Sequence, residues 1–364
     1  MTNGSGSFNS GALVPGDYKI LISAKSFASA QTTVTVQLGN TAAVHVKLQI
    51  GNEKETIEVR DSALQVNTVQ PTVQGVLNEQ QIDNLPINGR NFLDLAQLEP
   101  GVQVQDGSNF GKDGFSSISL GGRFGRTARI EVDGVDVSDE ILGATTTNIP
   151  ASGIQEFQLS QSSMDISTEL TTSGAINVIT RSGTNSIHGE AFSFFRDSSL
   201  AAALPAPPGL SEPFQRSQYG ARVGGPIVKN RFFFFVDAER TLQHEQAPVL
   251  VAAPFQQYSG SFSSPFHENN LMAKPDYQIT QSMRGFYRFS YFQNSFTTNG
   301  GTAGFSLYAG KNVTRTHVAG VDFGTGSFSH SIRFGLCLLK IRKDLSRHEL
   351  YFFPNSLLRC SLPC

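Results

Sequence analysis

Residues 283–293 read MRGFYRFSYFQ, and this stretch decides the fold. Aromatic residues occupy every second position from 287 to 291, namely Tyr287, Phe289 and Tyr291. The polar positions between them are Arg288 and Ser290. Successive side chains of a β-strand point to opposite faces, so this segment would have one aromatic face and one polar face. Residues 327–335, SFSHSIRFG, repeat the alternation. The pattern is typical of a transmembrane β-strand, which is about ten residues long.

Seven segments of this kind lie between residues 186 and 335. They are HGEAFSFFRD (188–197), SQYGARVGGPI (217–227), RFFFFVDAERT (231–241), NLMAKPDYQIT (270–280), MRGFYRFSYFQ (283–293), TRTHVAGVDFG (314–324) and SFSHSIRFG (327–335). Short turns separate some of them, and longer loops at 197–216 and 243–267 separate others. This asymmetry favours the first part of an antiparallel transmembrane β-barrel. A soluble β-sandwich would show the same alternation, so it stays open as an alternative.

The composition changes at the same place. Of the 28 Phe residues, 7 lie in residues 1–185 and 21 in residues 186–364. Aromatic surface on this scale needs an apolar environment, which lipid would supply. We therefore expect a mainly β chain whose second half is the first part of a barrel and is truncated.

The first half divides into two predicted units. Residues 13–60 contain short alternating segments separated by turn dipeptides, which indicates a partial N-terminal β-sandwich. Residues 61–185 mix a short helix before Pro86, a one-sided helix at 91–101 and several short strands, which predicts an α+β globule. Residues 336–364 contain no Gly and all three Cys, so we expect alternation to stop near Gly335 and a frameshifted tail or helical extension to follow.

Charge and motifs exclude several classes of function. The net charge is -2, and 16% of the residues are charged, so general nucleic-acid binding is not expected. The signatures of zinc proteases, serine hydrolases and phosphate loops are absent, and no Cys or His has ligand spacing to a second one. We predict no enzymatic activity, no catalytic residue, no metal site and no cofactor.

The terminal segments leave two readings open, a cytoplasmic protein and a chain whose true start is missing. The first residues, MTNGSGSFNS, have neither the basic region nor the apolar region of a signal peptide, and no apolar stretch reaches 18 residues. Plugged outer-membrane barrels use about 22 strands, whereas seven are predicted here. An open sheet would leave unpaired backbone groups in lipid, so we expect that this chain forms no pore alone.

An ordered series of short motifs carries a family resemblance. The series is LPINGRNF (85–92), LEPGV (98–102), VDGVD (132–136), IQEF (154–157), ITRSGTN (179–185), HG (188–189), FFR (194–196) and GGPI (224–227). In this order and spacing it resembles the plug and first barrel strands of TonB-dependent outer-membrane receptors. The closest resemblance is to the Oar-like class, in which a carboxypeptidase-regulatory-like domain precedes the plug. The likeness covers about residues 13–335.

The resemblance implies roles for several groups of residues. The plug motif would comprise Leu85, Pro86, Asn88, Gly89, Arg90, Asp133 and Gly134. Asn88-Gly89 and Asp133-Gly134 are also turn dipeptides suited to positive φ, and we expect that structural role for them. The barrel arginines expected to face the lumen and line a polar path are Arg222, Arg284, Arg288 and Arg333. In a soluble sandwich they would be solvated instead.

A further segment resembles the TonB box, which the energy-coupling partner grips as an added strand. Its residues are Glu55, Thr56, Ile57, Glu58 and Val59. The same segment would also serve as the last strand of the N-terminal sandwich, and the sequence favours neither reading.

The predicted protein resides in the cell outer membrane, with its signal peptide missing from this chain. It would bind an unidentified solute, which could be an oligosaccharide (carbohydrate binding), a peptide or a metal chelate. It would admit this solute through a plugged barrel gated by a TonB-type energy-coupling protein. Its other partner would be outer-membrane lipid. The alternative is a surface adhesion or interaction protein without transport.

Overall fold

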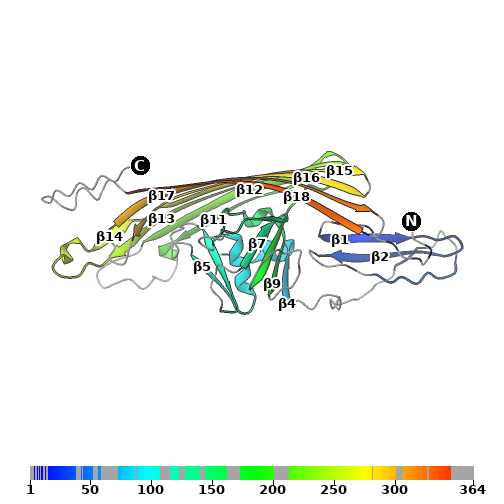
Figure 1. The fold of residues 1–364 in the computed structure, drawn as a ribbon, viewed down its shortest axis with the longest axis horizontal. Coiled ribbons are helices and arrows are strands. Elements are labelled where there is room, and N and C mark those ends of the chain that lie inside the picture. The colour runs from blue at the N-terminus through cyan, green and yellow to red at the C-terminus, as the bar shows by residue number, and fades with distance from the viewer. Residues whose placement is uncertain are drawn as a thin grey trace.

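A computed structural model of the chain is built mainly from β-strands, which form three separate bodies (Figure 1). None of the helices in the described part of the chain has both the length and the apolar character that a membrane crossing needs. The structure describes residues 15–37, 44–51, 56–58, 73–85, 87, 89–106, 115–122, 128–139, 144–161, 173–200, 213–280, 282–300, 306–325 and 328–345. It also describes the single positions 4, 6, 8, 10, 13 and 42.

The N-terminal body is a three-stranded sheet. β1 (Gly16–Ile22) pairs antiparallel with β2 (Ser29–Val36), and β2 pairs parallel with β3 (Thr56–Glu58). Residues 44–51, which contain one of the alternating segments of the predicted N-terminal unit, meet the sheet through an isolated bridge between Phe27 and Ile50. Among the described residues of this unit there is one sheet, and the second sheet of a sandwich stays a prediction.

The second body, called the plug below, spans the described residues from 73 to 180. Its mixed five-stranded sheet has the order β4 (Val73–Asn78), β9 (Ile154–Gln161), β10 (Gly174–Thr180), β7 (Ala128–Val132) and β8 (Val135–Asp136). β5 (Val102–Asp106) and β6 (Ser116–Leu120) form a separate pair. The short helices are α1 (Glu79–Asn84), η1 (Phe92–Leu98) and η3 (Ala151–Gly153).

Both helices predicted in the plug are present and capped. Asn78 and Gln81 form a capping box at the start of α1, and the Asn91 side chain accepts a hydrogen bond from the backbone N–H of Leu93 at the start of η1. The one-sided spacing of η1 buries Phe92, Leu93, Leu95 and Ala96 against the sheet. The plug thus has its own apolar core.

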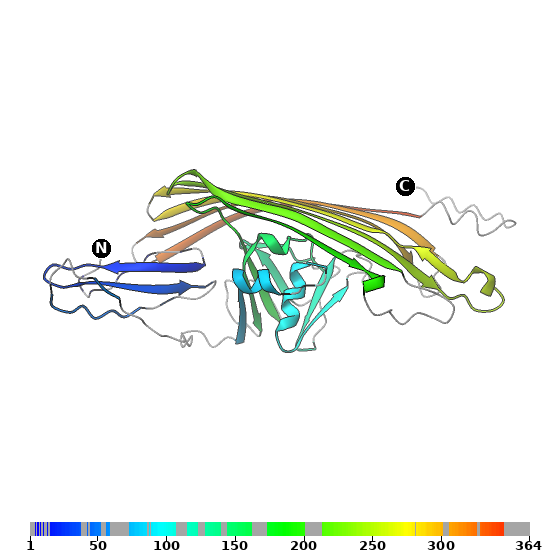
Figure 2. The same cartoon turned by 180° about the vertical axis from the view of Figure 1, so that it is seen from behind.

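The third body, called the wall below, is a curved antiparallel sheet that lies over the plug (Figures 1 and 2). Its strands, in spatial order, are β11 (His188–Asp197), β12 (Phe214–Val228), β13 (Phe232–Val249), β15 (Phe266–Thr280), β16 (Met283–Gly300), β17 (Ser306–Thr325) and β18 (Phe328–Leu345). A short strand, β14 (Gly260–Ser263), pairs with β13, and η5 (Ser198–Leu200) and η6 (Gln256–Tyr258) lie in the connections.

All seven predicted barrel segments lie in these seven strands, but most strands are longer than predicted. β12 and β15 have 15 residues each, and β17 has 20. β13 continues to Val249, which shortens the loop expected at 243–267. The polar side chains that we expected in loops instead extend the strands.

The expected break near Gly335 is wrong. β18 continues to Leu345 and stays in antiparallel register with β17, pairing Leu336 with His317 and Leu345 with Tyr308. The alternation is hard to see in the sequence because Leu336, Leu338 and Leu339 put apolar side chains on both faces. Residues 346–364 lie outside the described residues.

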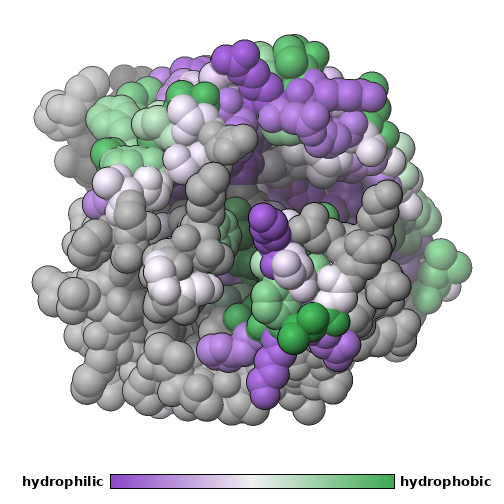
Figure 3. Space-filling view, turned by 90° about the vertical axis from the view of Figure 1, so that its right-hand side faces the viewer, coloured by the Kyte–Doolittle hydropathy of each residue, from purple (hydrophilic) through white to green (hydrophobic). Residues whose placement is uncertain are grey.

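The two faces of the wall differ as the alternation predicts. On β16, Arg288 and Ser290 are buried against the plug, whereas Tyr287 is 42% exposed on the other face. On β18, the outward Ile332 and Phe334 are 61% and 69% exposed. Figure 3 looks at the molecule from its N-terminal side and shows hydrophobic residues among the outermost ones of the arched wall. The face toward the plug is called the inner face below, and the opposite one the outer face.

Candidate functional site: the contact between plug and wall

A tight turn places Asp133 at the top of the plug. Asp133 and Gly134 have φ of 52° and 74°, and Val132 pairs with Val135 across them. Two consecutive positive φ values define the two-residue turn that the Asp-Gly dipeptide predicts. The turn directs the Asp133 carboxylate toward the wall, where it is 3% exposed.

A buried ion cluster forms around this carboxylate. Its members are Asp133 and Thr180 of the plug and Lys274 and Arg288 of the wall, called the Asp133 cluster below. Arg288 Nε lies 2.8 Å from Asp133 Oδ2, and Lys274 Nζ lies 3.5 Å from Asp133 Oδ1. The Thr180 hydroxyl donates to Asp133 Oδ2 at 2.7 Å, and the Thr180 N–H donates to Oδ1 at 2.9 Å.

The wall cations also hold the plug backbone. Lys274 Nζ donates to the carbonyl oxygen of Thr180 at 2.9 Å, and Arg288 donates to the carbonyl oxygen of Val132 at 3.3 Å. Arg288 is fully buried and Lys274 is 4% exposed. One carboxylate and two carbonyl groups of the plug therefore compensate the buried positive charges of Lys274 and Arg288.

The electrostatics of the cluster favour the charged form of Asp133. Burial by itself would raise the pKa of the Asp133 carboxyl. The charges of Lys274 and Arg288, together with the hydrogen bonds from Thr180, outweigh burial and hold that pKa below its ordinary value. The carboxylate therefore stays ionised at neutral pH.

A second contact, called the Asp83 bridge below, joins Asp83 of α1 to Arg181 and to Arg222 of β12. Asp83 accepts from Arg181 at 2.7 Å and from Arg222 at 3.0 Å. Arg222 also donates to the carbonyl oxygen of Ser152 at 2.8 Å. Burial would raise the pKa of Asp83, but the hydrogen bonds and charges of the two arginines lower it.

A third contact uses Arg90 of the predicted plug motif. Gly89 has the predicted positive φ, at 91°, and Arg90, for which none was predicted, has a φ of 58°. Arg90 Nε lies 2.9 Å from Glu239 Oε1 of β13, and its guanidinium lies 4.3 Å from the ring centre of Phe192 on β11. Leu85 follows the end of α1 and packs against the plug core, whereas Pro86 and Asn88 lie outside the described residues.

The four predicted barrel arginines all lie on the inner face. Besides Arg222 and Arg288, Arg284 donates to Ser182 at 3.1 Å and to Asp276 at 2.6 Å. Arg333 pairs with Asp322 at 2.6 Å and lies beside Gly134. These contacts join the wall to the plug or to neighbouring strands, and the predicted role in a polar path stays a prediction.

The segment predicted as a TonB box has its central residues in the N-terminal sheet. Ile57 of β3 is paired with Ala30 of β2 in parallel register, while Glu55 and Val59 lie outside the described residues. This arrangement is the one expected for a strand of the N-terminal domain. A role in partner binding stays a prediction.

Sequence reasoning missed the acidic and basic partners of these contacts. Asp83, Glu239 and Lys274 lie in segments that the sequence identifies as helix or strand, but the sequence analysis does not name them as site residues. Their signal was weak, although Lys274 has the same strand parity as Asp276 and Met272, which all face the plug. In the described part of the chain, no three His, Cys, Asp or Glu side chains gather as they would around a metal ion.

Comparisons with known proteins agree with this architecture. Residues 179–267 match the family model described as an outer membrane beta barrel domain. The outer membrane transporter YddB of Escherichia coli has a similar fold, with a TM-score of 0.55 and 12% sequence identity, over 72% of this chain and 38% of that chain. A mutant of the ferric enterobactin receptor PfeA of Pseudomonas aeruginosa has a TM-score of 0.48 and 13% identity, over 76% of this chain and 46% of that chain.

The fold is thus that of part of an outer membrane beta-barrel protein, and the location of the chain is the cell outer membrane. In sequence, the chain is similar to the TonB-dependent transporter Oar of Myxococcus xanthus, with 25% identity over 252 residues. That match covers 65% of this chain and 23% of Oar. The predicted relationship to TonB-dependent transporters is confirmed by the similarity to Oar, which is a transporter and not an enzyme. The carboxypeptidase-regulatory-like domain stays a prediction.

Proposed function

We propose that this chain is the plug and adjoining barrel wall of a TonB-dependent receptor that binds a solute at the cell surface. A TonB-type partner would displace the plug and so admit the solute. The Asp133 cluster carries the proposal, because it joins a separately folded plug to the wall through polar contacts. An adhesion protein would have no need for such a globule beneath its sheet.

The distribution of apolar contacts supports a plug that can move as a unit. The buried apolar cluster that fills the plug includes only Phe235 and Met272 from the wall, among the described residues. A second, smaller buried apolar cluster joins Phe115 and Ala144 of the plug to Phe292 of the wall. Many other described contacts between the two bodies use charged groups and carbonyl oxygens, which water can hydrate when the bodies separate. Displacing the plug would therefore expose little of its own core.

The N-terminal segment is where an energy-coupling partner would act. Residues 55–59 precede the plug, and Thr56, Ile57 and Val59 have the short β-prone side chains that suit strand addition. A partner that took this strand would compete with β2 for the backbone of β3. Pulling on it would transmit force to β4, the edge strand of the plug sheet.

Deleting residues 55–59 tests the role of the partner. The deletion is made in an intact homologue with a complete barrel, because this chain is not expected to form a pore alone. Cells expressing that homologue would be offered labelled oligosaccharides, peptides and ferric chelates. Energy-dependent accumulation should be lost in the deletion variant, whereas surface binding should remain. A variant with residues 4–8 deleted serves as the control. If uptake survives the deletion, residues 55–59 are not the TonB box.

An engineered disulfide tests whether the plug moves. Cys337 of β18 lies 3.7 Å from the Thr146 hydroxyl of the plug and 3.9 Å from the Thr316 hydroxyl of β17. With Cys360 and Cys364 replaced by Ser, oxidised Thr146→Cys would tie the plug to the wall. Oxidised Thr316→Cys would tie two wall strands instead. In an intact homologue that carries the equivalent cysteine pairs, uptake should stop only in the first variant and return on reduction; equal uptake in both would contradict plug movement.

A further inference from the structure

The outer face of the wall carries an apolar belt near the end with the tight turns. Its members lie on β15, β16 and β18, and all are between 38% and 69% exposed. On β17 the same rows contain Ala319, His317 and Arg315. They are Leu271, Tyr277, Tyr287, Ile332, Phe334, Leu336 and Leu338. An outward apolar band with aromatic residues is the surface that a barrel presents to lipid. From the start of β18 to Leu338, the strand has the length needed to cross a bilayer.

A row of polar and basic side chains crosses four strands beyond this belt. The register pairs His267 with Ser295, Ser295 with Lys311, and Lys311 with Arg342. Directly paired residues of an antiparallel sheet share a face, so the four side chains form one line on the outer face, called the basic row below. Lys311 and Arg342 are exposed.

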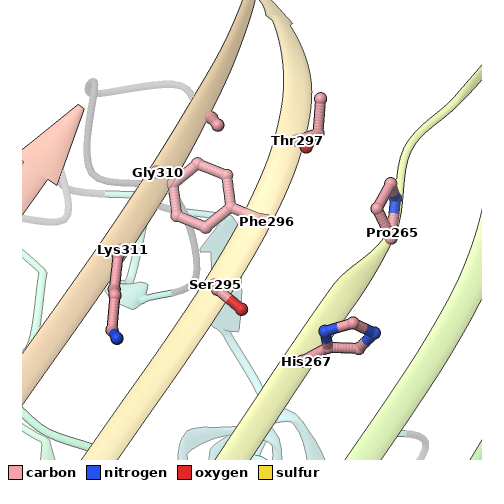
Figure 4. A pocket seen from close by; sticks show the side chains of 8 residues that line it. Pro265, His267, Ser295, Phe296, Thr297, Gly310 and Lys311 are labelled. Carbon is pink, nitrogen blue, oxygen red and sulfur yellow. The ribbon is translucent and has the colours of Figure 1, made fainter. Parts of the chain in front are cut away.

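The basic row borders a groove of about 270 Å³ on the outer face. In Figure 4, His267, Ser295 and Lys311 lie side by side on neighbouring strands, with parts of the plug behind them. Pro265 and Thr297 line the groove on the side away from the belt. The lining also includes Phe296 and Gly310, whose strand parity is that of the inner face.

One further row lies between the basic row and the belt. Its members are Asn269, Gln293, Val313 and Lys340, in direct cross-strand register. Neither row contains a carboxylate, so hydrogen-bond donors and positive charges predominate there. Arg240 of β13, paired with Asn269, adds an exposed cation at the same height.

The orientation of the wall assigns this surface to one leaflet. Tight turns join β12 to β13, β15 to β16 and β17 to β18 at the belt end, whereas longer connections leave the opposite end. In outer-membrane barrels the short turns are periplasmic and the longer loops are extracellular. The two polar rows therefore lie where the outer leaflet meets water.

We infer that the basic row binds the phosphate group of a lipid of the outer leaflet, whose acyl chains lie along the apolar belt. Two fixed cations, a hydroxyl and an imidazole in one line complement a phosphate, and the adjoining amides can donate to its ester oxygens. The belt and the groove meet at the depth where a lipid changes from chains to headgroup. This site is separate from the path through the lumen.

Binding of phosphatidic acid to the detergent-solubilised full chain tests the inference, with phosphatidylcholine as the comparison lipid. Native mass spectrometry would measure the lipid retained. Lys311→Gln combined with Arg342→Gln should lower the affinity for phosphatidic acid about tenfold or more. Lys25→Gln combined with Lys229→Gln removes the same charge away from the basic row and should leave the affinity unchanged.

Three results would overturn the assignment. Equal loss in both double variants would mean that general charge governs the binding. Inorganic phosphate that displaces phosphatidic acid at equal concentration would indicate a simple anion site. Unchanged affinity in the first variant would remove the basic row from the site. The variant Ser295→Ala, which keeps every charge, gives a smaller expected loss and checks the geometry if the double variant folds poorly.

Discussion

Arg288 of β16 and Asp133 of the plug form an ion pair of 2.8 Å in which both side chains are almost completely buried. A buried ion pair contributes little net stability, but removing one member leaves the other charge uncompensated. The pair therefore fixes the position of the plug more than it strengthens the fold.

Replacing Asp133 with Asn should weaken the attachment of the plug by about 3–5 kcal/mol, because Lys274 and Arg288 would stay buried without a counter-charge. Urea titration of the detergent-solubilised chain, followed by protease cleavage of the plug, measures the change. The matched control is Asp136→Asn, because Asp136 pairs with Arg129 at 3.1 Å within the plug and is partly exposed. The control should change stability by at most about 1 kcal/mol. Equal effects would show that the Asp133 cluster does not hold the plug.

The same cluster predicts a dependence on acid. The pKa of Asp133 in the folded chain lies below its unfolded value, so its contribution to stability is complete above the unfolded pKa. That contribution is lost as the pH falls through the folded pKa. Protease sensitivity of the plug should therefore rise in acid, and Asp133→Asn should remove this part of the rise. An unchanged acid profile in the variant would contradict the prediction.

Asp94 of η1 predicts the opposite dependence of plug stability on pH. Burial raises its pKa to about 6, with a partial offset from the charge of Arg216. A raised folded pKa gives stability that is present below the unfolded pKa and is lost as the pH rises through about 6. Asp94→Asn should stabilise the plug at neutral pH by on the order of 1 kcal/mol after solvent screening, and flatten this part of the urea-midpoint profile. If the urea midpoint of Asp94→Asn keeps the same dependence on pH, another titrating group is responsible for it.

How far the sequence could predict the structure depends on the range of each interaction. The alternation around Arg288 predicted its face, and the Asp-Gly dipeptide predicted the turn at Asp133, because both are set by neighbouring residues. Their contact joins positions far apart in the chain and depends on how the plug docks under the wall. Lys274 was missed for the same reason. The extent of β18 was missed because its partner strand, and not its own pattern, sustains it.

A close approach of backbones predicts that Gly183 cannot be replaced. A Cβ atom there would lie 2.4 Å from the carbonyl oxygen of Phe234 and 2.6 Å from that of Gly225, where the chain passes from plug to wall. Gly183→Ala should therefore destabilise the docked plug by about 1–3 kcal/mol through backbone displacement. The control is Gly260→Ala, because the nearest atom to its Cβ would be Phe262 at 3.7 Å. Matching thermal midpoints for the two variants would contradict the close approach.

The outer face of β18 predicts where a charge prevents insertion into lipid. Phe334 points outward and is 69% exposed, and Phe334→Arg should cost about 2–4 kcal/mol if it lies near the bilayer midplane. The folded fraction in lipid vesicles, read from a heat-dependent shift on gels, measures this cost. Ser329→Arg places the same side chain on the inner face of the same strand, so insertion should be little changed. If the two variants insert equally, β18 does not present Phe334 to lipid.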